Sequence, residues 1–382
     1  MIQLKDTQLQ NTAALVAAAI RTAEYYGFTS IEQALTRGKT PLLKKDFELA
    51  LVRRDEKALI PGIRAGLSVS RKDKDVQLLW RLVKHQNGLR TPTPCMTLEL
   101  HVIGAPSAIA EALLILVVSA IAEEAGVAKR VLSINSLGSF ESSNRFMRDV
   151  STFLRKHVET ISPTLRPKAA TDPLGTLIQL FEKGHPGTVR APQSVEYLTE
   201  DERRRFWELL EYLEMSGISY ELNSSILGSR DFWAHTLFEL AAVDEETGSR
   251  VPFAHGGRYD PLANKIAGEG TSAALATISV EIRGKSSFKP ERRISPALYF
   301  AHLGSEARRR ALPVLERLRR AGISVEQSLM QERLHEQMER AKGLKVSHLL
   351  IMGHKEAMEG TVLVREVATN AQEAILVDDL AG

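Results

Sequence analysis

The spacing of apolar residues predicts helices and strands over most of the chain. Apolar residues recur every three or four positions in the predicted helices, and at alternate positions or in short unbroken runs in the predicted strands. Before residue 283 the predicted helices are residues 8–26, about 108–124, 141–158 and 199–215. The predicted strands there are 98–103, 131–135, 218–222, 234–243 and 273–282. Ser139 is the expected N-cap of the third helix, and Thr199 with Glu202 forms a capping box that opens the fourth.

The pattern changes after a basic linker at residues 283–293. Short strands then alternate with helices, which is typical of a small α/β unit with a parallel or mixed sheet. The strands are predicted at 297–302, 323–326, 348–352 and 361–367, and the helices at 305–321 and 331–342. We therefore predict an α/β fold in two domains, with a core at residues 1–290 and a small domain at residues 296–382.

Two stretches of the core interrupt its regular pattern. Residues 140–215 are predicted as an insertion of helices and loops. Within it, residues 162–192 contain several prolines and glycines, and we predict a connecting loop there. The segment His255–Leu262 (HGGRYDPL) is predicted as a turn between two core strands.

The amino-acid composition argues against a membrane protein and against disulfides or cysteine-rich metal sites. The apolar run Ala108–Ala122 contains Glu111 and is too short to span a bilayer, so no membrane segment is expected. Cys95 is the single cysteine of 382 residues, which excludes an internal disulfide and any multi-cysteine metal site. A reducing, cytoplasmic location fits this cysteine usage. The formal net charge of +3 permits contact with nucleic acid without requiring it.

Four stretches, in the right order, resemble histidyl-tRNA synthetase, a class II aminoacyl-tRNA synthetase. They are Met96–Ser139 with its INSLG strand end, Ala191–Leu240 with the approach to the histidine signature, HGGRYDPL, and the region from about Ala297. The resemblance implies a class II antiparallel sheet with helices, an anticodon-binding-type domain at the C-terminal end, and a homodimer. The first 95 residues match the family poorly.

The family's reaction joins histidine to ATP and passes the histidyl group to tRNA, and arginines hold the phosphates. Arginine suits this role because its planar, permanently charged fork bonds phosphate at two points. The resemblance places Gly228 at the arginine position of the histidine signature, which reads ILGSRDFW here, and Val280 at that of the third class motif. Arg230 would share a face with Gly228 if the signature were an extended strand. No catalytic residue is therefore assigned.

The remaining ligand-holding positions implied by the resemblance are also altered. Thr97 stands where the family has a glutamine, and His101 where it has a glutamate. We predict a degenerate ligand pocket at Thr97, His101, Arg230, Asp231, Trp233, Gly256, Gly257 and Tyr259. No metal site is expected, because the sequence contains no HExxH or CxxC motif. No cofactor is expected either, unless the chain is an active ligase that uses ATP and Mg²⁺.

The basic helix predicted at residues 305–321 admits two interpretations. Its arginines are either candidates for RNA contact or members of a solvated, salt-bridged face. The RNA-binding candidates are Arg308, Arg309, Arg317 and Arg320.

Three functions remain open from the sequence. The leading hypothesis is a pseudoenzyme that binds tRNA or another structured RNA, or acts through a protein partner. The second is a divergent, active histidine–tRNA ligase in which Arg230, Arg81 or Arg90, and Arg283 replace the lost groups. The third is a regulatory subunit resembling that of ATP phosphoribosyltransferase.

Overall fold

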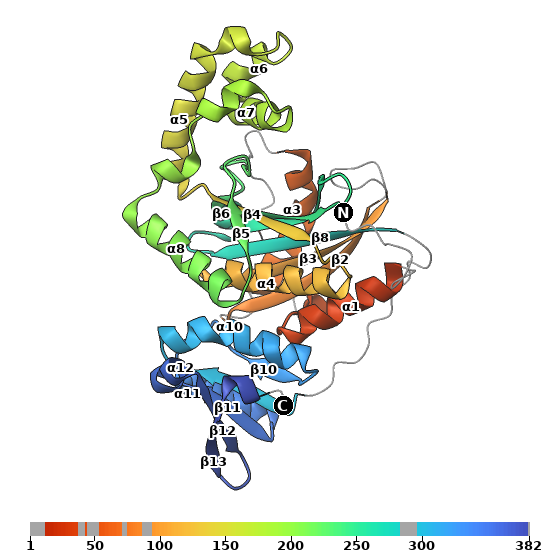
Figure 1. The fold of residues 1–382 in the computed structure, drawn as a ribbon, viewed down its shortest axis with the longest axis vertical. Helices are drawn as coiled ribbons and strands as arrows, with labels where there is room; N and C mark the ends of the chain where they lie inside the picture. Colours follow the sequence, from red (N-terminus) through yellow and green to blue (C-terminus); the bar gives the residue numbers. More distant parts are fainter. Residues whose placement is uncertain are drawn as a thin grey trace.

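The computed structural model describes residues 12–36, 43, 53–70, 75–85, 94–282 and 296–380. Among these residues it shows two β-sheets, which lie one below the other in Figure 1. The larger sheet has the strand order β1-β2-β3-β8-β7-β6-β4-β5, and the smaller has the order β10-β9-β11-β12-β13. Arg90, Arg283 and the linker at 283–293 lie outside the described residues.

The larger sheet is mainly antiparallel. Its strands pair antiparallel from β2 through to β4, whereas the short edge strands β1 and β5 run parallel to their neighbours. The strands are β1 Thr29–Ser30, β2 Gln77–His85, β3 Cys95–Ile103, β4 Arg130–Ser136, β5 Tyr220–Leu222, β6 Ala234–Val243, β7 Arg250–Arg258 and β8 Ala273–Glu281.

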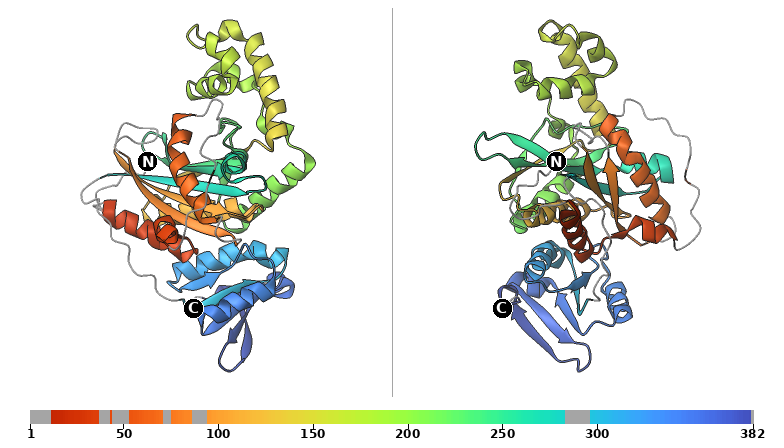
Figure 2. Two further views of the ribbon diagram at one scale, coloured as in Figure 1. Left: turned by 180° about the vertical axis from the view of Figure 1, so that it is seen from behind. Right: turned by 90° about the vertical axis from the view of Figure 1, so that its right-hand side faces the viewer.

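Different helices cover the two faces of this sheet (Figures 1 and 2). Leu98, Leu100 and Ile278 face the cluster built with helices α1, α4 and α8, whereas Leu79 and Leu275 face the cluster built with α3 and α9. These helices, with the short α2, are α1 Thr12–Tyr25, α2 Ile31–Thr36, α3 Arg54–Ser70, α4 Ile109–Glu124, α8 Glu200–Met215 and α9 Asp260–Ala267. Among the described residues, no helix is long and apolar enough to cross a bilayer.

The insertion forms a separate group of helices at one end of the molecule (Figures 1 and 2). It contains α5 Phe140–Lys156, α6 Arg166–Thr171 and α7 Pro173–Glu182. The prediction of a loop at 162–192 is therefore wrong. Three of its five prolines, Pro167, Pro173 and Pro186, lie at helix starts, because the first turn needs no N–H there and proline is preset to the helical φ. Ser139 caps α5 as predicted.

The smaller sheet mixes parallel pairs, β10 and β11 with β9, and antiparallel pairs, β11 with β12 and β12 with β13. Its elements are β9 Leu298–His302, α10 Ser305–Arg320, β10 Val325–Gln327, α11 Leu334–Leu344, β11 His348–Met352, α12 His354–Glu359, β12 Thr361–Glu366 and β13 Gln372–Leu376. Helix α10 lies against the core, where the Tyr25 hydroxyl donates to the Leu315 carbonyl at 2.8 Å.

The HGGRYDPL segment is not the predicted turn. His255, Gly256 and Gly257 lie inside β7, and Asp260 begins α9. A Cβ on Gly256 would lie 2.3 Å from the Leu275 carbonyl oxygen, and one on Gly257 would lie 2.4 Å from that of Thr236. The two glycines are thus needed because neighbouring backbone approaches closely within the sheet.

Candidate functional site

Strand β3 presents polar side chains on one face of the larger sheet. Thr97, Glu99 and His101 alternate with Leu98 and Leu100, so the two sets point to opposite faces. The leucines belong to the core shared with α4. The polar set is nevertheless buried, because it lies on the face covered by α3.

A line of polar residues crosses five strands on this face. In register, Glu99 lies opposite Arg81 on β2 and Thr277 on β8; His255 on β7 lies opposite Thr277 and Glu239 on β6. We call Arg81, Glu99, Thr277, His255 and Glu239 the polar row. The Thr277 hydroxyl lies 3.0 Å from His255 Nδ1. Two residue pairs further along, on the same face, Thr97 Oγ1 lies 3.0 Å from Ser279 Oγ.

Glu99 is the most enclosed charge of the polar row. Its side chain is 1% exposed, and Oε2 lies 3.6 Å from both Arg81 Nη1 and His101 Nε2. A Cβ on Gly62 of α3 would lie 1.9 Å from the same oxygen. Among the described residues, neither carboxylate oxygen has a hydrogen-bond donor. The helix therefore closes over a carboxylate that is held by charge alone.

Tyr259 reaches the same place from the start of α9. Its hydroxyl lies 3.4 Å from His101 Nδ1, and the two rings meet edge to face. Burial raises the pKa of the Tyr259 hydroxyl, so it stays protonated. The structure thus brings together His101 and Tyr259 of the predicted pocket, while Thr97 lies on the same face of β3, four residues before His101.

Arg258 and Asp260, the neighbours of Tyr259 in the chain, form hydrogen bonds that hold elements of the core together. Arg258 is 1% exposed and donates to Glu111 on α4, to Asp260 and to two carbonyl oxygens in the segment just before α4. Asp260 accepts from the Ala273 N–H at 2.7 Å. Although burial raises the pKa of Glu111, the guanidinium groups of Arg258 and Arg205 outweigh it and hold that pKa at about 2. This ion pair joins β7 to α4.

The histidine signature is a turn, so the premise that Arg230 shares a face with Gly228 is wrong. The N–H groups of Phe232 and Trp233 both bond to the Ser229 carbonyl. Arg230 donates to Asn144 on α5 and lies over the Phe140 ring, and Asp231 pairs with Lys265 at 2.9 Å. Arg230 and Asp231 therefore lie toward the insertion, apart from Thr97 and His101.

Glu56 on α3 fixes this turn to the core. Its carboxylate, buried at 4% exposure, accepts from the Ser229 N–H and hydroxyl and from Trp233 Nε1 at 2.9 Å. A Cβ on Gly228 would lie 2.3 Å from Trp233 Cδ1. The indole ring thus fills the space that a side chain at position 228 would need.

A cavity of about 300 Å³ lies between the signature turn and the polar row. Glu56, Trp233, His255, Gly256 and Glu239 are among its lining residues. Its lining includes Trp233 and Gly256 from the predicted pocket, together with His255 and Glu239 from the polar row. Val280 is elsewhere: it lies in the α4-side core, on the face opposite Thr97 and His101.

The four candidate RNA-binding arginines of α10 all have carboxylate partners. Arg308 pairs with Glu332 and Glu208, and Arg309 with Glu306 and Glu211. Arg317 pairs with Asp378, and Arg320 with Glu316 and Glu123. Several of these acids belong to α4 or α8. The structure therefore favours the salt-bridge interpretation, in which α10 joins the small domain to the core.

Comparisons with known proteins agree with this architecture. The model of the anticodon binding domain matches residues 298–382. Histidine–tRNA ligase from Caldanaerobacter subterraneus is 27% identical over 288 residues, covering 74% of this chain and 68% of the relative. The enzyme from Acaryochloris marina is 29% identical over 283 residues, covering 74% and 65%. The chain is a histidyl-tRNA synthetase-like protein.

The fold of this histidyl-tRNA synthetase-like chain has a solved counterpart. Apo histidyl-tRNA synthetase from S. aureus superposes with a TM-score of 0.51 at 18% identity, covering 100% of this chain and 99% of that one. The predicted fold class, a class II-type sheet followed by an anticodon-binding-type domain, is confirmed. The sequence alignments span about two thirds of the curated relatives' length.

Sequence reasoning missed most of the polar row and Glu56. The alternation in MTLELHV places Glu99 on the face of Thr97 and His101, and this period-2 signal could have identified it. His255, Thr277 and Glu239 needed the strand register. Glu56 lies in the first 95 residues, where the resemblance is weakest. Among the described residues, no group of three His, Cys, Asp or Glu side chains is placed to hold a metal ion.

Proposed function

We propose that this histidyl-tRNA synthetase-like protein is a pseudoenzyme that binds tRNA or another structured RNA and does not aminoacylate. The main support for the absence of aminoacylation is the packing around Gly228. The family's arginine position is a glycine, and the Trp233 ring already fills the space that an arginine would enter. The other arginine position, Val280, lies in the core on the opposite face of the sheet.

Charge on the polar row also argues against a bound nucleotide. Glu99 and Glu239 belong to the row, and Glu56 lines the adjoining cavity. A polyphosphate beside these groups would need compensating cations. Arg81 is present on the row, but it already faces Glu99 at 3.6 Å and Glu32 at 3.8 Å.

Histidine-dependent ATP–pyrophosphate exchange is expected to stay at background. Each preorganised donor lost from an active site typically costs about 100- to 1000-fold in rate, and two clamp positions lack an arginine. The measurement is an exchange assay on protein whose folding is checked by circular dichroism, with a bacterial histidine–tRNA ligase as the positive control. Exchange above background that depends on histidine would contradict the proposal.

One observation favours the alternative of a divergent, active ligase. Arg81 lies on the same face as Thr97 and His101, where the alternative needs an arginine. In that case Mg²⁺ and ATP are required, and Arg81→Gln should abolish the exchange. The regulatory-subunit alternative, the homodimer and the domain bounds at 1–290 and 296–382 stay predictions.

The RNA-binding part of the proposal is supported by basic residues on the insertion rather than on α10. Arg155 and Lys156 on α5, Lys168 on α6, and Lys183 and Arg190 beyond α7 are all exposed. Among the described residues, none of the five has a carboxylate within ion-pair distance, in contrast to the α10 arginines. Unpaired, exposed cations are the groups that can neutralise phosphates and release counterions.

Reversing charge on α5 is expected to weaken RNA binding. The double variant R155E/K156E should lower the affinity for tRNA at least tenfold and flatten the dependence of log K on log salt, because fewer phosphates are neutralised. The matched control is R309E/R320E on α10, two charge reversals at residues already paired with acids. Filter binding or fluorescence anisotropy at several salt concentrations measures both.

The two variants separate the interpretations. If R309E/R320E loses affinity and R155E/K156E does not, the RNA surface lies on α10, as the sequence first suggested. If the unmodified protein binds no structured RNA at low salt, the RNA-binding proposal is wrong, whatever the exchange assay gives.

A further inference from the structure

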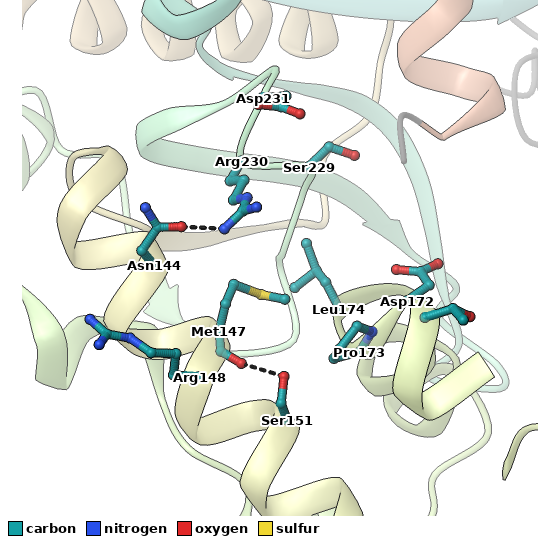
Figure 3. Close-up of a pocket in the computed structure, with 11 residues that line it drawn as sticks. Asn144, Met147, Arg148, Ser151, Asp172, Pro173, Leu174, Ser229, Arg230 and Asp231 are labelled. Atoms are coloured by element: carbon teal, nitrogen blue, oxygen red, sulfur yellow. Dashed lines mark hydrogen bonds between the residues drawn. The ribbon is translucent and has the colours of Figure 1, made fainter. Parts of the chain in front are cut away.

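A second, larger cavity of about 530 Å³ lies between the insertion and the signature turn (Figure 3). We call it the insertion pocket. Three segments build it: α5, the chain around the start of α7, and the turn Ser229–Asp231. Its size is typical of sites for small molecules, which are mostly apolar with a few polar groups. It is separate from the polar row, and the proposed function makes no use of it.

Apolar and polar groups occupy different sides of the insertion pocket. Figure 3 shows Arg230 and Asn144 facing each other on one side, joined by a hydrogen bond, and Pro173 and Leu174 on the opposite side. The Met147 side chain lies between them. An occupant would therefore meet an apolar surface at one end and a guanidinium group at the other.

The pocket's two carboxylates are already compensated. Asp231 pairs with Lys265 Nζ at 2.9 Å. Asp172 caps α7 by accepting from the Gly175 N–H at 2.9 Å, where the partial positive charge of the helix start stabilises it. Neither group is left to attract a cation.

Arg230 has no such compensation. Within the described part of the chain, Arg230 donates its hydrogen bond to a neutral amide oxygen, that of Asn144, and its guanidinium lies 5.6 Å from the centre of the Phe140 ring. Among the described residues, no carboxylate lies within ion-pair distance of Arg230, nor of Arg148, which also lines the pocket. Arginine has five N–H donors, so most of those on Arg230 remain for a ligand.

We propose that the insertion pocket binds a small organic anion. Its carboxylate or phosphate group is held by Arg230, with the Asn144 amide as a second donor, and its apolar body packs against Met147, Pro173 and Leu174. A guanidinium group binds either oxyanion at two points. A concave site with an apolar wall suits a small molecule better than an RNA backbone. Because the ligand touches both α5 and the signature turn, it links the insertion to the core.

Isothermal titration calorimetry on the full chain without RNA tests this proposal. The probes are phenyl phosphate, benzoate and inorganic phosphate at matched ionic strength. At least one aryl probe is expected to bind saturably at one site, about tenfold or more tighter than inorganic phosphate, because its ring buries apolar surface. Comparison of the two aryl probes shows whether phosphate or carboxylate is preferred.

Two variants and a control locate the binding. R230Q should weaken binding about tenfold or more, since it removes the charge that pairs with the anion. L174W should also weaken it by filling the apolar side while Arg230 stays in place. R204Q, at an exposed arginine of α8 that already pairs with Glu200 and Asp201, should bind as the unmodified chain does. All variants are first checked for native melting.

Three results would overturn the proposal: no saturable binding of any probe at millimolar concentration, equal affinity for inorganic phosphate and the aryl probes, or unchanged affinity in both R230Q and L174W. Since the titrations contain no RNA, ATP or histidine, their failure leaves the proposed function standing. A failure of the RNA or exchange assays likewise leaves the insertion pocket untouched.

Discussion

Glu111→Gln is expected to lower the free energy of unfolding by about 3–5 kcal/mol, the usual result of removing one partner of a buried ion pair. Glu111 is fully buried in α4, where its carboxylate accepts from Arg258 Nη2 at 2.6 Å and from Arg205 Nη2 at 2.7 Å. Glutamine keeps the volume but leaves the buried Arg258 with Asp260 as its remaining carboxylate partner, 3.3 Å away. Urea denaturation followed by circular dichroism measures the change.

Glu159→Gln is the matched control. The same substitution there removes a pair with Arg166 at 3.3 Å, but the Glu159 side chain is 84% exposed. Water and salt screen such pairs, so the expected cost is below about 1 kcal/mol. Equal costs at the two positions would mean that the Glu111 pair does not hold β7 against α4.

Acid titration gives the Glu111 prediction a second test. The folded protein holds the pKa of Glu111 at about 2, below the ordinary value of 4.5, despite burial, because Arg258 and Arg205 stabilise the ionised form. A depressed pKa stabilises the folded state above the ordinary pKa, and that stability is lost as pH falls from about 4.5 toward 2. The Gln variant should lack this part of the acid dependence.

The sequence predicted helices and strands well where the pattern of apolar residues was clear. Strand β6 begins and ends at Ala234 and Val243 as expected, and β11 at His348 and Met352. The apolar run with Glu111 became α4, which is buried from Ile109 to Ala122. Prediction failed where proline and glycine were interpreted as breakers. At 162–192 proline opens helices, and at Gly256 and Gly257 glycine admits neighbouring backbone inside a strand.

The site could be predicted only in part, because its geometry depends on long-range pairing. His101 lies 3.4 Å from the Tyr259 hydroxyl, whereas Thr97 only shares their face of the sheet, four residues earlier on β3. The partner of Glu111 is 147 residues away, at Arg258, and no local pattern points to it. The position of Arg230 depended on whether ILGSRDFW is a strand or a turn. Its Ser229–Trp233 turn is held by Glu56, from a helix that the sequence did not identify.

Gly228→Arg is expected to destabilise the fold without restoring catalysis. The new Cβ would lie 2.3 Å from Trp233 Cδ1 and 2.8 Å from its Nε1, and that ring is 5% exposed. Overpacking of this kind costs about 1–3 kcal/mol. Moving the indole also removes the hydrogen bond to Glu56. Urea denaturation and the ATP–pyrophosphate exchange assay measure the two effects, and exchange should remain at background.

Gly343→Arg separates the local clash from a general effect of the substitution. Gly343 lies in α11, and a Cβ there would meet open space. Arginine also has a higher helix propensity than glycine, so this variant should be as stable as the unmodified chain or slightly more so. If Gly228→Arg matched it, Trp233 would not fill the space at position 228, and the structural argument for lost chemistry would fail.

The double variant Gly228→Arg/Trp233→Tyr addresses the chemistry itself. Tyrosine is smaller than tryptophan, so part of the lost stability should return. Exchange is still expected at background, because the second arginine position is still occupied by Val280, which faces the core. Histidine-dependent exchange in the double variant would show that positions 228 and 233 alone separate this chain from an active ligase.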